Sequence, residues 1–382
     1  MPPLMRWIMV GLAWIVCSIT LLPERHYFLA PSFAPEKALQ PQNDGDPIFN
    51  VKFLNIGQGL PMVHVASPVE LKGGELASVW YGGTGECAPD VKIYFTTINS
   101  TPRVIMDRAR AERDLGRPVR SVGNSVLLLN SDGSLRLVFV SIAMGKWSGS
   151  QLNTCVSRDN GLTWSRVERL TLSPFFNFSE LVRNRPIPLI GGGWCLPIYQ
   201  EFLGKFPELL WLDDVDGKLI ARKTRVAGGC SVFQPSMIPL DGRRAIVLLR
   251  DYTDVHRIFM SRSENGGLTW SRPAPTNLPN PDAGISGLKL SDGRLLVAYN
   301  DSTSNRSNLA LAVSHDEGLN WKRIAVFNNS NATNKTFSYP YLMHDSTGYL
   351  YLAYTADGKL IELDSFNESW LAFEEEGAGG KK

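Results

Sequence analysis

Six polar residues stand directly before or after apolar stretches that are typical of paired β-strands. They carry one imidazole, one carboxyl group, two amides and two guanidinium groups: His64, Glu86, Gln234, Arg250, Asn300 and Arg306. Side chains of these types can bind a polar ligand, and a carboxyl group can also donate a proton to it. If the strand ends meet around one axis, we expect these residues to form a ligand site there.

The apolar stretches are joined by signals for tight turns. In each case an apolar run leads into Asp-Gly or Gly-Gly and then into a second apolar run, which is typical of a β-hairpin. The pattern occurs over residues 69–80, 126–139, 237–249 and 288–299. The polar candidates lie at the ends of such hairpins, so the hairpins would position them.

A short turn motif occurs three times. Each copy has Ser, then Asp or Asn, then Gly and then Trp at offsets of 0, 2, 4 and 7 residues, beginning at Ser157, Ser263 and Ser314. Asp and Asn bond the nearby backbone and Gly accepts a positive φ, so the motif suits a turn. The Trp can lie against the hairpin that the turn closes. Three copies at fixed offsets indicate a structural repeat.

The spacing of this motif predicts the architecture. The gaps are 106 residues (157 to 263) and 51 residues (263 to 314), and a degenerate copy over residues 212–219 lies midway in the longer gap. A period of about 51–53 residues built from strands is typical of one blade of a β-propeller. We therefore predict an all-β fold, a six-bladed β-propeller over residues 48–370. Its hairpins include those closed by this turn motif, which is called the Asp box.

Composition agrees with a globular all-β domain. The chain has 382 residues, 43% of them hydrophobic, with 34 Gly, 10 Trp and a net charge of +2. This balance, without a basic run, gives no reason to expect nucleic-acid binding. Cys17 lies in an apolar segment, and the other cysteines form two disulfides or stay buried free thiols: Cys87, Cys155, Cys195 and Cys230. Their spacing is not that of a metal site, and we expect no cofactor.

The N-terminal 22 residues are expected to be a membrane anchor or a signal segment. Residues 8–22 are almost entirely apolar and follow Arg6. The stretch is long for the core of a signal peptide and short for a membrane span. We favour a single hydrophobic helix that stays in the membrane, with a cleaved signal peptide as the alternative. A buried helix would not explain the charged flank.

The flanking segments complete the predicted organisation. Residues 23–47 contain five prolines and resemble an extended linker, and residues 371–382 are predicted to be a disordered tail. Seven Asn-x-Ser/Thr triplets point to a secretory route. We therefore expect the propeller to lie outside the cytoplasm, in the periplasm, at the cell surface or in a secretory lumen.

The repeats and several other strings resemble one protein family. The chain resembles the sialidase superfamily, whose members are six-bladed propellers with Asp-box repeats, and it is most similar to the bacterial-type predicted neuraminidases with BNR repeats. The similarity covers about residues 50–365, and its more particular strings are residues 80–86, 183–188, 278–284 and 337–340.

The resemblance implies a glycosidase for an acidic sugar. In this family three arginines hold the sugar carboxylate, because a planar guanidinium matches a planar carboxylate. A Tyr with a Glu beside it attacks the anomeric carbon, and an acidic residue protonates the leaving group. By position Arg250 and Arg306 match the second and third arginines, and Glu86, with Asp90 close behind it, matches the acid. Arg185, within the string 183–188, is taken as a further substrate-binding residue.

Three positions depart from the family pattern. His64 occupies the place of the first arginine, Gln234 that of the acidic partner, and Phe337 that of the nucleophilic tyrosine. Tyr339 is the nearest tyrosine and is our candidate nucleophile. On a regular strand it would lie about 7 Å beyond Phe337, so this role requires a register shift.

Two main hypotheses follow. The first is a membrane-anchored, sialidase-like exo-glycoside hydrolase that acts on a glycan bearing a carboxylate. Its catalytic candidates are Glu86, Asp90 and Tyr339, and its substrate-binding candidates are Arg250, Arg306, His64, Gln234, Glu201 and Arg185. Glu86 paired with Asp90 or Glu201 is an alternative acid/base pair. The second hypothesis, favoured by Phe337 and Gln234, is a non-catalytic carbohydrate-binding propeller. A purely structural or protein-binding propeller is a third.

Overall fold

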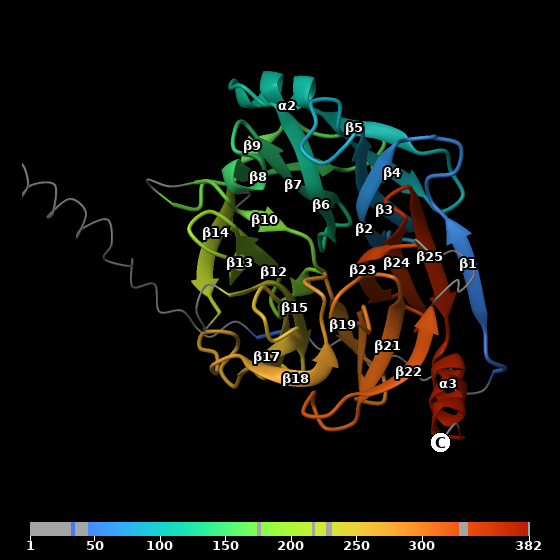
Figure 1. The fold of residues 1–382 in the computed structure, drawn as a ribbon. Coiled ribbons are helices and arrows are strands. Elements are labelled where there is room, and N and C mark those ends of the chain that lie inside the picture. Colours follow the sequence, from blue (N-terminus) through green and yellow to red (C-terminus); the bar gives the residue numbers. More distant parts are fainter. Residues whose placement is uncertain are drawn as a thin grey trace, which may run out of the picture.

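The computed structural model describes residues 32–34, 45–173, 177–215, 218–226, 231–327 and 335–380. Six antiparallel sheets surround one axis (Figure 1), which confirms the predicted six-bladed propeller. The hydrophobic segment 1–22 and most of residues 23–47 lie outside the described residues. Among the residues that the structure describes, no helix has both the length and the apolar character needed to cross a membrane.

The blades follow one another along the chain. Within each blade, successive strands lie progressively farther from the axis. Blade 1 contains β2 (Met62–Glu70), β3 (Leu76–Gly83), β4 (Lys92–Thr97) and β5 (Arg103–Asp107). Blade 2 contains β6 (Ser121–Leu129), β7 (Leu135–Ile142), β8 (Ser150–Ser157) and β9 (Glu168–Arg169). Blade 3 contains β10 (Leu181–Val182), β11 (Ile187–Pro188), β12 (Trp194–Gln200), β13 (Phe206–Val215) and β14 (Lys218–Arg225).

The second half of the ring repeats this order. Blade 4 contains β15 (Val232–Pro239), β16 (Ala245–Asp251), β17 (Arg257–Ser263) and β18 (Ala274–Pro279). Blade 5 contains β19 (Ser286–Lys289), β20 (Leu295–Tyr299), β21 (Leu309–Ser314) and β22 (Lys322–Phe327). Blade 6 contains β23 (Phe337–His344), β24 (Leu350–Ala356), β25 (Leu360–Phe366) and β1 (Phe49–Phe53). Helices α2 (Arg108–Leu115) and α3 (Glu368–Gly380) and the short 3-10 helix η1 (Lys146–Gly149) lie outside the sheets.

The ring is closed by pairing the two ends of the propeller. Strand β1 is the outer strand of blade 6, where Phe49 pairs with Phe366 and Phe53 pairs with Glu362. Among the described residues, six clusters of buried apolar side chains lie at the six junctions between neighbouring blades. Each blade therefore buries its two faces only when both neighbours are present, and closure completes the core.

The innermost strands carry the irregularities that shape the centre of the ring. Strands β2, β6, β15 and β23 each contain a bulge, and Val65, Gln234 and Tyr339 at three of these bulges have φ angles of 58°, 46° and 56°. A bulge re-aims the side chains next to it. Serines on the inner strands also bond to the backbone of the neighbouring blade, as where Gly287 N donates to Ser236 Oγ at 2.9 Å.

The Asp-box motifs form the turns between the third and fourth strands of blades 2, 4 and 5. In each turn the Gly N–H donates to the Ser hydroxyl, at 2.8 Å for Gly161, 2.9 Å for Gly267 and 2.8 Å for Gly318. All three glycines have a positive φ, as the motif predicts. The degenerate copy over residues 212–219 falls on the corresponding β13–β14 turn, whose residues 216 and 217 lie outside the described ranges.

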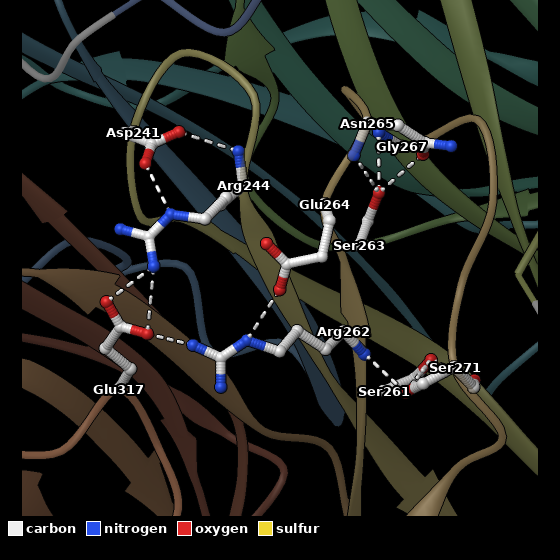
Figure 2. Close-up of polar contacts among 10 residues, drawn as sticks. All are labelled: Asp241, Arg244, Ser261, Arg262, Ser263, Glu264, Asn265, Gly267, Ser271 and Glu317. Atoms are coloured by element: carbon white, nitrogen blue, oxygen red, sulfur yellow. Dashed lines mark hydrogen bonds and ion pairs between the residues drawn. The ribbon is translucent and has the colours of Figure 1, made fainter.

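A network of ion pairs joins the turn face of blade 4 to that of blade 5, beside one Asp box (Figure 2). Glu317 accepts from Arg244 Nη1 at 3.0 Å and also from Arg262 Nη2. Arg244 Nε in turn donates to Asp241 at 2.6 Å, and Arg262 Nε donates to Glu264 at 3.1 Å. These side chains are partly exposed, so the network contributes more to the relative position of the blades than to net stability.

The C-terminal segment is ordered, contrary to the prediction of a disordered tail. Residues up to 380 belong to α3, whose Leu371 is fully buried and whose Trp370 contacts Phe49 at a ring-centroid distance of 4.8 Å. Glu375 accepts from Arg294 Nη1 at 2.7 Å and bonds to His315. The acidic and Gly-rich composition suggested disorder, but these apolar and ionic contacts hold the helix against blades 5 and 6.

The three cysteines in the described ranges distinguish between disulfides and free thiols. Cys87, Cys155 and Cys195 are buried free thiols, so the alternative of two disulfides is wrong for these three. Burial raises the pKa of the Cys87 thiol to about 11 and that of Cys155 to about 12. All three therefore act as apolar packing groups at neutral pH.

A short N-terminal segment is also part of the folded domain, so the prediction of a linker throughout residues 23–47 is wrong for residues 32–34. Phe33 is fully buried between blades 3 and 4 and stacks on Trp211 at a ring-centroid distance of 6.4 Å. Its N–H donates to Gly242 O, and Ala34 N donates to Pro188 O, both at 2.9 Å. The segment is thus fastened to the face of the ring that carries the Asp boxes.

We expect Phe33→Ala to lower the free energy of unfolding by about 3 kcal/mol, because it removes a fully buried aromatic ring from a blade junction. Phe33→Leu, which keeps an apolar side chain there, should lose clearly less. Denaturant unfolding of the two variants and the wild type measures this. Equal midpoints for the wild type and Phe33→Ala would show that the segment adds no stability.

Candidate active site

The predicted polar residues lie mainly on the face of the ring opposite the Asp boxes. In an antiparallel four-stranded blade, the turns between strands one and two and between three and four share one face. The other connections share the opposite face, and there the β3–β4, β7–β8, β12–β13 and β20–β21 loops surround the first residues of the inner strands. Glu86, Glu201 and Arg306 come from these loops, and His64 and Tyr339 come from the inner strands.

Tyr339 lies at the centre of this group. The guanidinium carbons of Arg183 and Arg306 are 5.7 Å and 5.9 Å from the centroid of its ring. Burial raises the pKa of the half-buried Tyr339, and the charge of Glu86 acts in the same direction, whereas Arg250, Arg306 and Arg183 oppose the shift. The phenol is therefore neutral in the resting protein, next to positive charges that would stabilise its anion.

The structure corrects the placement of the candidate nucleophile. Phe337, which the family pattern puts in that place, is buried and packs against Tyr354 at a ring-centroid distance of 5.9 Å. A register shift between Ser338 and Tyr341 and a φ of 56° at Tyr339 turn the latter toward the arginines. This is the register shift that the role of Tyr339 requires.

Arg250 and Gln234 belong to one chain of hydrogen bonds. Arg250 Nη1 donates to Gln234 Oε1 at 2.9 Å, and Arg250 Nε donates to Asp282 Oδ1 at 2.7 Å. Gln234 Nε2 and Asn124 Nδ2 both donate to the hydroxyl oxygen of Tyr199, each at 3.1 Å. Because both ends of the Gln234 amide are bonded, this residue is a fixed neutral spacer beside Arg250.

His64 and Glu86 form a second group, completed by Trp147. His64 Nε2 lies 3.7 Å from Glu86 Oε1, and Trp147 Nε1 donates to Glu86 Oε2 at 3.2 Å. The His64 ring meets the Tyr339 ring edge-on, at a centroid distance of 5.1 Å. Burial lowers the pKa of His64, Glu86 counteracts this shift and Arg306 adds to it, so the imidazole is neutral near pH 7.

Glu201 lies near Arg250 at the edge of the site and is paired with a lysine. Its Oε2 is 3.9 Å from Lys205 Nζ, which also lies 3.7 Å from the ring centroid of Tyr252. Burial raises the pKa of Glu201, while the positive charges of Lys205 and Arg250 oppose the rise. The Glu201–Lys205 pair is thus a charged group at the edge of the site, and the negative charge of Glu86 also acts on Glu201.

Two predicted residues are not brought to the site. Asp90 accepts from Thr84 N at 2.9 Å and from Thr84 Oγ1 at 2.7 Å, so it closes a turn of the β3–β4 loop. Those hydrogen bonds, led by the Thr84 side chain, lower its pKa. Arg185 lines a cavity with Glu70 and His344, near the other ends of β2 and β23. It therefore lies toward the opposite mouth of the ring.

Arg183 is the arginine that sequence analysis missed. It is 2% exposed, and it donates to Pro340 O at 3.2 Å and to Ile285 O. Burial lowers its pKa to about 10. A Cβ at Gly284 would lie 2.9 Å from its guanidinium carbon, so Gly284 leaves room for it. Arg183 supports the backbone beneath Tyr339, and only its presence in the string 183–188 hinted at a role.

Asn124, Tyr199 and Asp282 were also missed as site residues. Tyr199 accepts from Gln234 and from Asn124, and Asp282 accepts from Arg250. These contacts join parts of the chain that are far apart in sequence, so a single sequence does not reveal them. Within the described ranges, no cluster of three or more His, Cys, Asp or Glu residues is placed to hold a metal ion. The groups that this site brings together are phenols, carboxyl groups, an imidazole and several guanidinium groups.

Comparison with known proteins identifies the family of the propeller domain. Residues 74–352 match the family model of the BNR repeat-like domain. The match covers well over half of the chain, so the chain belongs to the BNR repeat-like family. No curated protein has a significant match to the chain.

Solved structures share the fold at low sequence identity. The Hadza microbial sialidase Hz136 superposes with a TM-score of 0.66 at 18% identity, over 80% of this chain and 66% of that chain. The intramolecular trans-sialidase from Ruminococcus gnavus gives 0.65 at 13% identity, over 84% and 98%. A protein of unknown function from Dyadobacter fermentans gives 0.66 at 14% identity, over 83% and 98%. These superpositions establish a common fold.

Proposed function

We propose that this protein is an exo-acting retaining glycoside hydrolase for sugars that carry a carboxylate, with Tyr339 as nucleophile and Glu86 as the acid that protonates the leaving group. The observation that supports the proposal is that the centroid of the Tyr339 ring lies 5.7 Å and 5.9 Å from the guanidinium carbons of Arg183 and Arg306, and that the charges of Arg250 and Glu86 also act on its phenol. Sialidases are the group of retaining glycosidases that use a tyrosine in place of a carboxylate nucleophile.

Charge explains why a phenol suits this substrate. A carboxylate nucleophile would repel the carboxylate of the sugar, whereas a neutral phenol does not. Arg306 is half-buried and Arg250 is buried beside the partly exposed Asp282, and both can offer N–H donors to the substrate carboxylate. We assign Arg183 to support of the site, because its Nη atoms are bonded to backbone carbonyls.

The second candidate function is carbohydrate binding without catalysis. Gln234 favours it, because an amide cannot accept the proton of the nucleophile as a carboxylate would. Both functions predict binding of an acidic sugar, and only the first predicts product. Turnover therefore separates them.

We expect Tyr339→Phe to reduce the turnover of an acidic-sugar glycoside by at least about 10³-fold, because it removes the nucleophilic oxygen and keeps the ring. Binding of the free acidic sugar should change by no more than a few-fold. Tyr349→Phe, on the turn between β23 and β24, is the matched control and should behave as the wild type. Product release is followed on a panel of sialosides and uronate glycosides, together with calorimetric binding. Binding without turnover in the wild type would establish the second function instead.

We also propose that residues 8–22 attach the protein to a membrane, with the propeller outside the cytoplasm. Their apolar sequence after Arg6 supports this. Phe33 is bound to the Asp-box face, so a membrane-attached segment that precedes it would extend from that face of the propeller. The candidate active site would then open away from the lipid.

The attachment predicts that the full chain floats with phospholipid vesicles in a density gradient. Leu12→Asp together with Ile15→Asp should shift it to the soluble fraction, because each charge at the centre of an apolar segment costs about 3 kcal/mol of insertion. A wild-type chain that stays with the soluble fraction would refute the attachment.

A further inference from the structure

The proposed reaction needs a proton acceptor for Tyr339, and the residue in the expected place cannot serve. This inference rests on the proposed function. Gln234 is an amide whose oxygen accepts from Arg250 and whose nitrogen donates to Tyr199. Glu86 must give a proton to the leaving group in the same step, so it cannot also take one directly from Tyr339.

Among the groups that face Tyr339, one is suited to accept a proton. The arginines are permanent donors. Tyr199 is itself a phenol whose pKa burial raises, and its oxygen already accepts two N–H bonds. His64 has a neutral imidazole, and its ring is in edge-on contact with that of Tyr339 at a centroid distance of 5.1 Å.

The two ring nitrogens of His64 are in different surroundings. Nε2 faces Glu86 Oε1 at 3.7 Å. Nδ1 is buried and has no hydrogen-bond partner within the described part of the chain. A buried ring nitrogen without a partner is unfavourable, and such groups call for a functional explanation. A role as a proton acceptor explains it, and the carboxyl group of Glu86, 3.7 Å from the other nitrogen, is placed to stabilise the imidazolium that forms.

We propose that His64 and Glu86 act as one proton-handling pair that replaces the missing acidic partner of Tyr339. In the first step Tyr339 Oη forms a bond to the anomeric carbon while the bond from that carbon to the leaving-group oxygen breaks. The phenolic proton passes to His64, and the proton of Glu86 passes to the leaving group. The step starts from the form in which Glu86 carries a proton, and it leaves an imidazolium beside a carboxylate, whose attraction stabilises the intermediate.

The second step reverses these transfers. Water forms a bond to the anomeric carbon and gives a proton to Glu86, while the bond from that carbon to Tyr339 Oη breaks. The phenolate takes the proton from His64, and the pair returns to its neutral form. Each proton that leaves a residue in the first step is replaced in the second, so no further reactant is needed.

The family resemblance offers the opposite role for His64. At this place the family has an arginine that binds the sugar carboxylate, and a protonated histidine would be a weaker version of it. The two roles make opposite predictions for His64→Arg. A binding cation would be kept or improved by that substitution, whereas a proton acceptor would be lost, because a guanidinium group is never deprotonated in a protein.

The experiment measures steady-state turnover and the rate of the first release of an aryl leaving group from an aryl sialoside. The variants are His64→Arg, His64→Ala and Glu86→Gln, with His256→Asn, an exposed histidine elsewhere, as the control. We expect both His64 variants to slow the first release by about 10²- to 10³-fold with KM within about threefold. Added imidazole should restore part of the activity lost in His64→Ala, which it could not do if the loss came from a folding defect.

Glu86→Gln should keep the rate of the first release, because an aryl oxide leaves without an acid. The same variant should lose steady-state turnover.

The outcomes separate this inference from the function on which it rests. A wild type that releases no leaving group would refute the glycosidase function and this role together. An active wild type with His64→Arg at full kcat, or with an effect on KM alone, would overturn only the role of His64. It would show that His64 is a substrate-binding cation.

Discussion

Crowding of the inner strands around one axis is the constraint on which the site depends. Strand β2 packs against β6 and β23, and β19 packs against β15 and β23, so the side chains that point to the axis have little room. Strands β15 and β23 contain bulges, and Gln234 and Tyr339 at these bulges have a positive φ. Such a conformation costs about 1–2 kcal/mol for a residue other than Gly, so it persists only where the surrounding structure holds it.

The surroundings of these bulges show what holds them. Arg183 bonds to the carbonyl groups of Pro340 and Ile285, next to the bulge of blade 6 and the start of blade 5. Asn184 Nδ2 donates to Pro235 O at 2.7 Å beside the bulge of blade 4. Blade 3 therefore supports both bulges, and the closed ring keeps blades 3, 4 and 6 in place. Fold stability and site geometry are consequences of the same closure.

Charge at the centre follows from the same arrangement. Arg250 is buried and pairs with Asp282, which is 45% exposed, while Gln234 adds no negative charge beside it. An acidic residue in the place of Gln234 would offset one more arginine. With an amide there, the guanidinium groups keep a surplus of positive charge that suits an anionic sugar, and proton transfer has to be carried out by other groups.

Local patterns in the sequence were enough to predict the fold and the outline of the site. The Ser-Asp-Gly-Trp turns depend on short-range hydrogen bonds, and Glu86, Arg250 and Arg306, chosen because they flank predicted hairpins, lie on one face of the ring. The errors came from tertiary structure. A bulge gives Tyr339 the position that a regular strand would have denied it. The break between β10 and β11 places Arg183 near Tyr339 and Arg185 toward the opposite mouth of the ring, and Thr84 holds Asp90 in a turn. The ordered C-terminal helix likewise depends on contacts with distant blades.

The central claim is that the hub of this propeller recognises a carboxylate through its arginines. Calorimetric titration of the wild type with an acidic sugar and with the same sugar as its uncharged carboxamide tests it most directly. The account predicts that the acid binds at least about tenfold more tightly, since hydrogen bonds to a charged group contribute about 1.5–3 kcal/mol. Equal affinities for the acid and the amide would contradict it.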